Sequence, residues 1–115
     1  MSVRAVELMK RNDGGSIVNI ASVNAFRASA TQAIYSATKA AMVSMTQSFA
    51  MECGEFGIRV NALCPGLTDT KFTAVFKANP EALANVVEKY PIKRIAQPLD
   101  MVGAVLLMAT EAGAC

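Results

Sequence analysis

Three residues between positions 22 and 39 carry groups that could move a proton together: the hydroxyl of Ser22, the phenol of Tyr35 and the ammonium of Lys39. If the chain is helical from about Ala33 onward, Tyr35 and Lys39 stand four residues apart on one face. A phenol needs about 4 kcal/mol of help to act as a base near pH 7, because its ordinary pKa is about 10. An ammonium about 4 to 5 Å away supplies about 3 to 4 kcal/mol by favouring the phenolate. The trio therefore indicates acid–base chemistry centred on a tyrosine.

Two short apolar runs and one long helix would position these groups. The runs Ser16–Ala21 and Ile58–Cys64 are rich in apolar residues, as are the buried strands of parallel sheets. The helix predicted at Ala33–Cys53 joins them in a parallel βαβ unit. Ser22 follows the first run directly, so that strand would deliver its hydroxyl to the edge of the sheet. We therefore predict an α/β chain with a doubly wound parallel sheet.

The order and spacing of these motifs resemble the short-chain dehydrogenase/reductase family. The similarity rests on Ser22 at the end of GGSIVNIAS, on YSATKAA from Tyr35, on IRVNALCPGLTDT at 58–70 and on KRIAQPLDM at 93–101. It covers nearly all of the 115 residues and is similar to the 3-oxoacyl-ACP reductase type of member. The resemblance implies that residues 1–115 are one fragment of a single NAD(P)-binding Rossmann-like domain. That fragment would be truncated at both ends and would lack the Gly-rich coenzyme half.

The resemblance also implies roles for individual residues. Tyr35 would exchange a proton with the substrate oxygen, and Ser22 would hydrogen-bond that oxygen. Lys39 would lower the pKa of the phenol and, with Tyr35, bind the nicotinamide ribose of NAD or NADP. The coenzyme would further meet the turn after the second strand, at Pro65, Gly66, Leu67, Thr68 and Thr70. Asn24 and Gln32 lie close to the trio in sequence and are expected to contact the substrate. The implied reaction is hydride transfer between nicotinamide and a small carbonyl compound or secondary alcohol.

Composition narrows the partners and the location. A net charge of +2, from 11 basic and 9 acidic residues, gives no electrostatic case for a nucleic-acid partner. The chain has no histidine, and its three cysteines show no C-x-x-C spacing, so no metal site is expected. The longest apolar stretch, at 101–109, is too short to span a bilayer, and no targeting signal is visible. We therefore predict no membrane partner and a reduced, cytoplasmic location.

Other segments have simpler interpretations. Gly14 and Gly15 precede a strand, so they are predicted to form a helix-to-strand turn rather than a phosphate loop. Residues 71–91 show a loose helical pattern divided by Pro80, which resembles the family's substrate lid and has Phe72, Val75 and Phe76 as apolar members. A last helix is predicted from Gln97–Asp100 to about Thr110.

One row of the long helix carries only small side chains and would let a second helix approach closely. We therefore predict a homo-oligomer, a dimer or tetramer, that packs through this row. Its members are Ala33, Ala37, Ala40, Ala41 and Ser44.

Two other functions remain open. The chain could be a truncated, non-catalytic piece that only binds a partner, or it could belong to an epimerase or lyase on the same scaffold. Ser22 and the PGLTDT turn favour the reductase. Strands that are apolar on both faces need further strands and helices to cover them, and two strands alone do not form such a sheet. The isolated 115 residues are therefore predicted to be inactive.

Overall fold

The computed structural model describes residues 2–27, 29–74 and 78–114. Its centre is a parallel pair of strands, β1 (Gly15–Ile20) and β2 (Ile58–Leu63), in register from Gly15 opposite Ile58 to Ile20 opposite Leu63. The two form a two-stranded sheet within the described residues. Each strand lies within one residue of its predicted bounds, and the parallel α/β arrangement confirms the predicted fold class.

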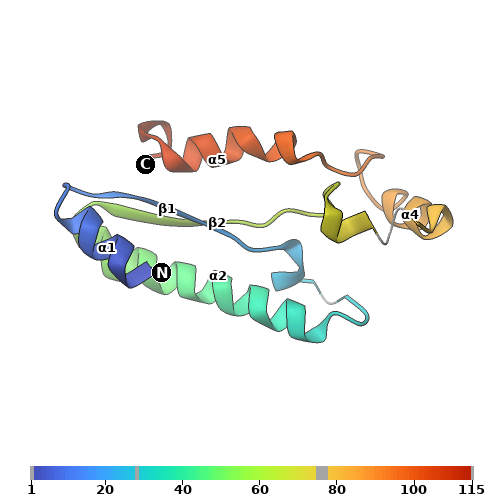
Figure 1. Ribbon diagram of the computed structural model, residues 1–115, viewed down its shortest axis with the longest axis horizontal. Helices are drawn as coiled ribbons and strands as arrows, with labels where there is room; N and C mark the ends of the chain where they lie inside the picture. The colour runs from blue at the N-terminus through green and yellow to red at the C-terminus, as the bar shows by residue number, and fades with distance from the viewer. Residues whose placement is uncertain (1, 28, 75–77, 115) are drawn as a thin grey trace. The chain divides into compact units, whose positions relative to one another are not determined.

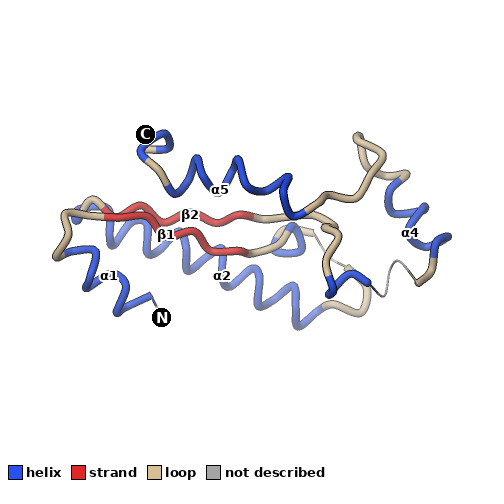
Figure 2. Tube along the Cα trace, turned by 45° about the horizontal axis from the view of Figure 1, so that its top comes forward, coloured by secondary structure: helices blue, strands red, loops and turns tan. Residues whose placement is uncertain are grey.

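Helices cover both faces of this strand pair. Helices α1 (Ser2–Lys10) and α2 (Ala33–Cys53) lie on one face, and α5 (Val102–Ala109) lies along the other (Figures 1 and 2). The core forms where β2 meets α1 and α2, and Ile58 is its most buried member at 1% exposure. Its other members are Cys53 and Val60, with Val6, Met9, Ile17, Phe49 and Ala50 packed against them. Helix α2 has the predicted bounds.

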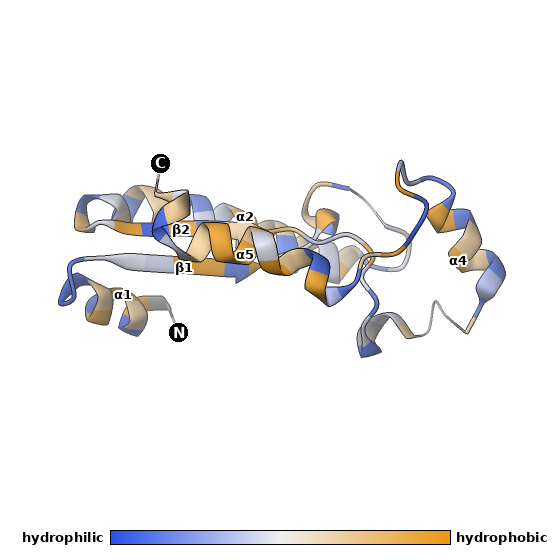
Figure 3. Ribbon diagram, turned by 90° about the horizontal axis from the view of Figure 1, so that it is seen from above, coloured by the Kyte–Doolittle hydropathy of each residue, from blue (hydrophilic) through white to orange (hydrophobic). Residues whose placement is uncertain are grey.

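The burial of β1 is lower than its apolar sequence predicts. No residue of β1 is fully buried, and the Ile20 side chain at its end is 50% exposed. The described sheet has only two strands, so each strand keeps one edge without a neighbouring strand. Helix α5 is largely hydrophobic, as the colouring in Figure 3 shows, and its Val102, Leu106 and Leu107 are exposed. No helix in the described part of the chain has the length and apolar character needed to cross a membrane.

The turn from α1 into β1 depends on glycine. Gly14 has φ of +115° and donates its N–H to the carbonyl of Met9 at 3.0 Å, which closes the helix. A Cβ at Gly14 would lie 2.5 Å from the carbonyl oxygen of Gly57, the residue that precedes β2. Backbone therefore meets backbone where both strands begin, and the predicted helix-to-strand turn is confirmed.

Helix α5 is attached to the same end of the sheet. Ser16 and Arg59 are neighbours in the register, and both donate to the carbonyl of Met108, at 2.7 Å and 2.8 Å. Arg59 also donates to the carbonyl of Thr110 at 2.9 Å. A guanidinium suits this position, because carbonyls at the end of a helix carry partial negative charge.

The chain divides into two compact units, Met1–Pro65 with Gly103–Cys115, and Gly66–Val102. The second unit holds the short turns η3 (Lys71–Thr73) and η4 (Pro98–Met101) and helix α4 (Pro80–Val87). Pro80 begins α4 after Asn79, which caps the helix by accepting from the N–H of Ala82 at 3.1 Å, in agreement with the predicted break at Pro80. Val75, Phe76 and the side chain of Phe72, predicted in the lid, lie outside the described residues. The predicted last helix begins as η4 and continues as α5.

Candidate active site

Ser22 lies just beyond the carboxyl end of β1, and hydrogen bonds hold the backbone on both sides of it. The N–H of Ala21 donates to Leu63 at 2.7 Å, and the N–H of Val23 donates to Pro65 at 3.1 Å, so both neighbours of Ser22 are tied to the β2 strand and its extension. Ser22 is 8% exposed and caps the short turn η1 (Val23–Ala25), where its hydroxyl accepts from the N–H of Asn24 at 3.2 Å. A hydroxyl that accepts one bond can still donate its proton to another group.

Tyr35 and Lys39 share one face of α2, as their spacing predicts. The Lys39 ammonium lies 5.7 Å from the centre of the Tyr35 ring, within the range of a cation–π contact. The same ammonium donates to the carbonyl of Ile20, the last residue of β1, at 2.9 Å. An ammonium has three donors, so this bond fixes its position and leaves donors for a ligand. Lys39 thus joins the phenol on α2 to the end of the strand that leads into Ser22.

Asn24 and Gln32 are bonded to each other. Asn24 lies in η1, and its side-chain Nδ2 donates to Oε1 of Gln32 at 2.5 Å. Gln32 is the residue before α2, three positions before Tyr35. Both were predicted from the sequence as substrate contacts, but their bond to one another was not.

Asn19 and Thr46 were missed as contributors to this site. Asn19 in β1 donates through Nδ2 to the Thr46 hydroxyl in α2 at 2.9 Å, and that hydroxyl donates to the Met42 carbonyl at 2.8 Å. Thr46 is 4% exposed and Asn19 is half-buried, so a largely buried hydrogen bond anchors α2 against the strand. The only sequence signal was that Asn19 interrupts an apolar strand.

The turn predicted to meet the coenzyme is divided between the two units. Pro65 belongs to the first unit, where its carbonyl accepts from Val23, whereas Gly66, Leu67, Thr68 and Thr70 belong to the second. Within the second unit, the Thr68 hydroxyl donates to the Gly66 carbonyl at 3.1 Å, and the N–H of Thr70 donates to the Thr73 hydroxyl at 3.0 Å. Thr70 is the residue that precedes η3.

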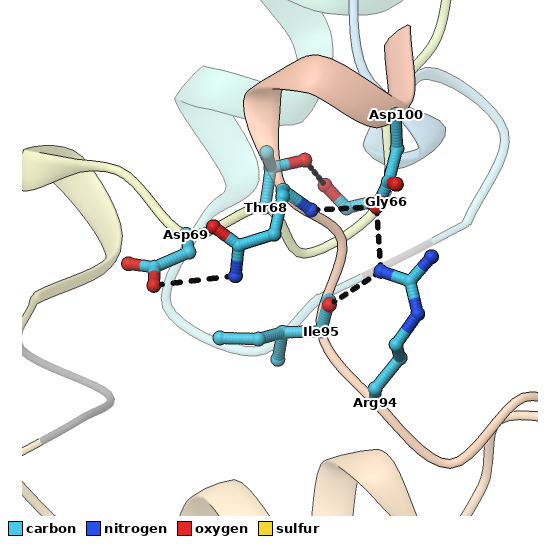
Figure 4. A network of polar contacts seen from close by, with 7 residues as sticks. Gly66, Thr68, Asp69, Arg94, Ile95 and Asp100 are labelled. Atoms are coloured by element: carbon cyan, nitrogen blue, oxygen red, sulfur yellow. Dashed lines mark hydrogen bonds and ion pairs between the residues drawn. The ribbon is translucent and has the colours of Figure 1, made fainter.

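A second segment of the same unit braces this turn. Ala96 forms a parallel bridge with Thr68, accepting from the N–H of Asp69 at 2.8 Å and donating to Leu67 at 3.0 Å. Figure 4 shows the side chains around it, including the contact between Asp69 and the amide of Gln97, 3.4 Å long. The turn therefore has a fixed shape within its own unit.

Arg94 and Asp100 form the charged part of this network. Arg94 donates to Asp100 Oδ2 at 2.5 Å and to the Ile95 carbonyl at 3.2 Å, and the N–H of Gln97 also donates to Asp100, at 2.7 Å. The hydrogen bond from Arg94, followed by the one from Gln97, lowers the pKa of Asp100 below its ordinary value. The same hydrogen bond raises the pKa of Arg94.

A pocket of about 390 Å³ opens beside this network, within the range of small-molecule sites. Its walls are mainly apolar, and Arg94 and Asp100 bring charge to it. The remaining lining residues are Gly66, Leu67, Tyr90, Pro91, Ile92 and Ala96. Two residues predicted to bind the coenzyme therefore line a cavity.

Known proteins match nearly the whole of this chain. A family model described as enoyl-(acyl carrier protein) reductase matches residues 1–115. An uncharacterized oxidoreductase of Thermotoga maritima is 38% identical over 115 residues, covering 96% of this chain and 46% of its own length. Dehydrogenase/reductase SDR family member 4 of Oryctolagus cuniculus is 32% identical, covering 96% of this chain and 43% of that protein.

A solved structure has the same fold. A gluconate 5-dehydrogenase from Burkholderia cenocepacia J2315, in complex with NADP and tartrate, superimposes with a TM-score of 0.95 and 26% sequence identity. The superposition covers 98% of this chain and 44% of that one. The chain thus spans less than half the length of each of these proteins.

Proposed function

This chain belongs to the short-chain dehydrogenase/reductase family, and we propose that it is the catalytic half of a Rossmann-like domain in an NAD(P)-dependent oxidoreductase. The observation that carries the proposal is the position of Lys39. Its ammonium joins the Tyr35 ring to the end of β1, two residues before Ser22. This arrangement gathers a proton donor, a hydroxyl and a cation at the carboxyl end of a parallel strand, where such sheets bind ligands.

The donor set fits the nicotinamide end of NAD or NADP. Lys39 uses one donor for Ile20 and has others for ribose hydroxyls. Pro65, Gly66, Leu67, Thr68 and Thr70 offer backbone groups and hydroxyls that suit a carboxamide, and Gly66 and Leu67 line the pocket of the second unit. When bound, nicotinamide supplies or accepts the hydride.

The chain's own residues would manage the proton. In the reducing direction, Tyr35 gives its hydroxyl proton to the substrate oxygen as that oxygen gains charge, and Ser22 donates a hydrogen bond to the same atom. Lys39 stabilises the phenolate that remains on Tyr35. In the oxidising direction, the phenolate takes the proton back from a secondary alcohol. Asn24 and Gln32 lie beside this position and offer Oδ1 and Nε2 to a substrate hydroxyl.

A second copy of the chain could pack against α2. The row predicted from the sequence is solvent-exposed: Ala33, Ala37, Ala40, Ala41 and Ser44. Small side chains allow two helices to approach closely, which supports a dimer or tetramer.

Deuterium transfer tests the proposed reaction. The protein expressed from the gene that encodes these residues would be mixed with 4-deuterated NADH or NADPH and a panel of ketones and aldehydes. We expect saturable binding of one coenzyme and deuterium on the former carbonyl carbon of at least one product, detected by mass spectrometry.

Tyr35→Phe and Tyr90→Phe provide the matched pair for this test. Tyr35→Phe should abolish transfer while coenzyme binding persists, because the phenylalanine has no proton to give. Tyr90→Phe, in the second unit, should retain transfer. A protein that binds neither coenzyme, or that transfers deuterium equally well with Tyr35→Phe, would overturn the proposal.

A further inference from the structure

We propose that Asn24 and Gln32 form an amide latch that fixes Ser22 relative to Tyr35. The latch is the hydrogen bond from Asn24 Nδ2 to Gln32 Oε1. The inference rests on the proposed function, because it concerns two groups proposed to act on one substrate oxygen. It assigns both amides a positioning role in addition to any contact with the substrate.

Asn24 is bonded to both sides of the site. Its backbone N–H donates to the Ser22 hydroxyl at 3.2 Å, and its side chain donates to Gln32 at 2.5 Å. The backbone around Ser22 is already tied to β2 and Pro65. Asn24 therefore connects the fixed end of β1 to Gln32, the residue before α2.

Gln32 transmits this position to the helix. Its carbonyl accepts from the N–H of Ser36 at 2.8 Å, in the first turn of α2, which also contains Tyr35. The Gln32 side chain makes no capping hydrogen bond to α2. Its side chain is directed to Asn24 instead.

The backbone before Gln32 is strained in a way that requires such support. Thr31 has φ of +64°, a conformation that is unfavourable for a β-branched residue. Conformations of this kind persist where the surrounding contacts hold them in place. The bond from Asn24 to the next residue is one such contact.

The latch matters because proton transfer depends on short distances. A proton donor must lie within about 2.6 to 3.2 Å of the atom it protonates. A displacement of about 1 Å can lower a rate about 10²-fold. Loss of the latch should therefore lower kcat, whereas loss of a simple substrate contact that is equal in ground and transition states should raise KM.

Carboxylate substitutions separate these two roles. Gln32→Glu keeps an acceptor for Asn24 Nδ2. Asn24→Asp supplies an acceptor for Gln32 Nε2, once the Gln32 amide has rotated so that its nitrogen faces residue 24. The double variant places two carboxylates opposite each other and has no donor. The uncharged pair Asn24→Leu with Gln32→Met removes the latch without adding charge, and Gln47→Glu adds the charge elsewhere on α2.

We expect each single carboxylate variant to raise KM through its altered substrate contact but to keep kcat within about 3-fold, because the latch persists, and we expect Gln47→Glu to change neither kcat nor KM. Both double variants should lose at least about 10-fold in kcat, in addition to any rise in KM from the lost substrate contacts. Double variants that keep kcat within about 3-fold of the natural protein, so that the effects are confined to KM, would refute the latch.

A measurement without substrate tests the bond itself. In the NMR spectrum, the side-chain amide protons of Asn24 should exchange with water more slowly than those of the exposed Asn85, and Gln32→Met should abolish the difference. Equal exchange in the natural protein would contradict the latch. If Tyr35→Phe kept full activity while exchange at Asn24 stayed slow, the proposed function and the catalytic role of the latch would fail, although the bond would remain.

Discussion

The two ends of the β1–β2 strand pair are held by different kinds of contact. At the amino end, Gly14 approaches the backbone of Gly57, and the register partners Ser16 and Arg59 hold the carbonyl at the end of α5. At the carboxyl end, Lys39 reaches from α2 to Ile20. Backbone contacts hold both ends, because Ala21 and Val23 bond to Leu63 and Pro65 at the carboxyl end. The amino end adds helix capping, and the carboxyl end adds side chains with protons to donate.

This difference suggests a division of tasks. Parallel sheets bind ligands beyond the carboxyl ends of their strands, so residues there are selected for binding and catalysis as well as for stability. Residues at the amino end can be selected for stability alone. Substitutions at the amino end should therefore lower the free energy of unfolding and leave kcat per folded molecule unchanged, and substitutions at the carboxyl end should do the reverse.

The largest effect is expected from Lys39→Met at the carboxyl end. Turnover should fall at least about 10²-fold and coenzyme affinity should weaken, because the side chain then carries neither the cation nor its donors. The melting temperature should change little. Lys89→Met removes an exposed lysine near the end of α4 and should alter neither quantity. Steady-state kinetics measures turnover, and coenzyme fluorescence titration measures coenzyme affinity. An unchanged coenzyme affinity in Lys39→Met would contradict the role given to the carboxyl end.

Gly14→Ala tests the amino end. The new Cβ meets the Gly57 carbonyl and the backbone must hold φ of +115°, so we expect the free energy of unfolding to fall by about 3 kcal/mol. Gly103→Ala, whose Cβ would meet no atom within 4 Å, is the control and should cost nothing. Denaturant unfolding gives the loss, and active-site titration gives kcat per folded molecule. A drop in that kcat would argue against a separate amino end.

The sequence predicted the strands and α2 well, because apolar runs and helical spacing are local properties. It also predicted that Tyr35 and Lys39 share a face, since that follows from helix geometry alone. It did not predict the bonds from Arg59 to the end of α5 or from Asn24 to Gln32. Those contacts join residues 49, 51 and 8 positions apart, and they depend on how the elements pack.

Arg59→Met should have a smaller effect at the same end. The substitution removes two charge-assisted hydrogen bonds to Met108 and Thr110, so the free energy of unfolding should fall by about 2 kcal/mol. Hydrogen exchange of the amides of α5 should accelerate, while kcat stays constant. Arg59→Lys, which keeps the charge but loses the fork, should fall between the two. If α5 exchanged at the same rate in Arg59→Met, the capping role would be wrong.

The smallest effect is expected in the second unit, where a substitution should leave both ends of the strand pair unchanged. Asp100 has a lowered pKa, so its pairing with Arg94 stabilises the folded state above the ordinary value of 3.8 and is lost as the pH falls through the folded value. The difference in melting temperature between the natural protein and Asp100→Asn should be constant above about pH 5 and vanish in acid. A difference that grew in acid would contradict this sign. Amide exchange in β1 and β2 should not respond.

In the proposed reaction, Tyr35 performs the proton transfer at the carboxyl end of the strands. The most direct test is to measure turnover and melting temperature together for Tyr35→Phe, a change of one hydroxyl. We expect turnover to fall by about 10² to 10⁴-fold while the melting temperature and coenzyme affinity stay close to those of the natural protein. A Tyr35→Phe protein with near-normal turnover, or one that loses activity only because it unfolds, would contradict it.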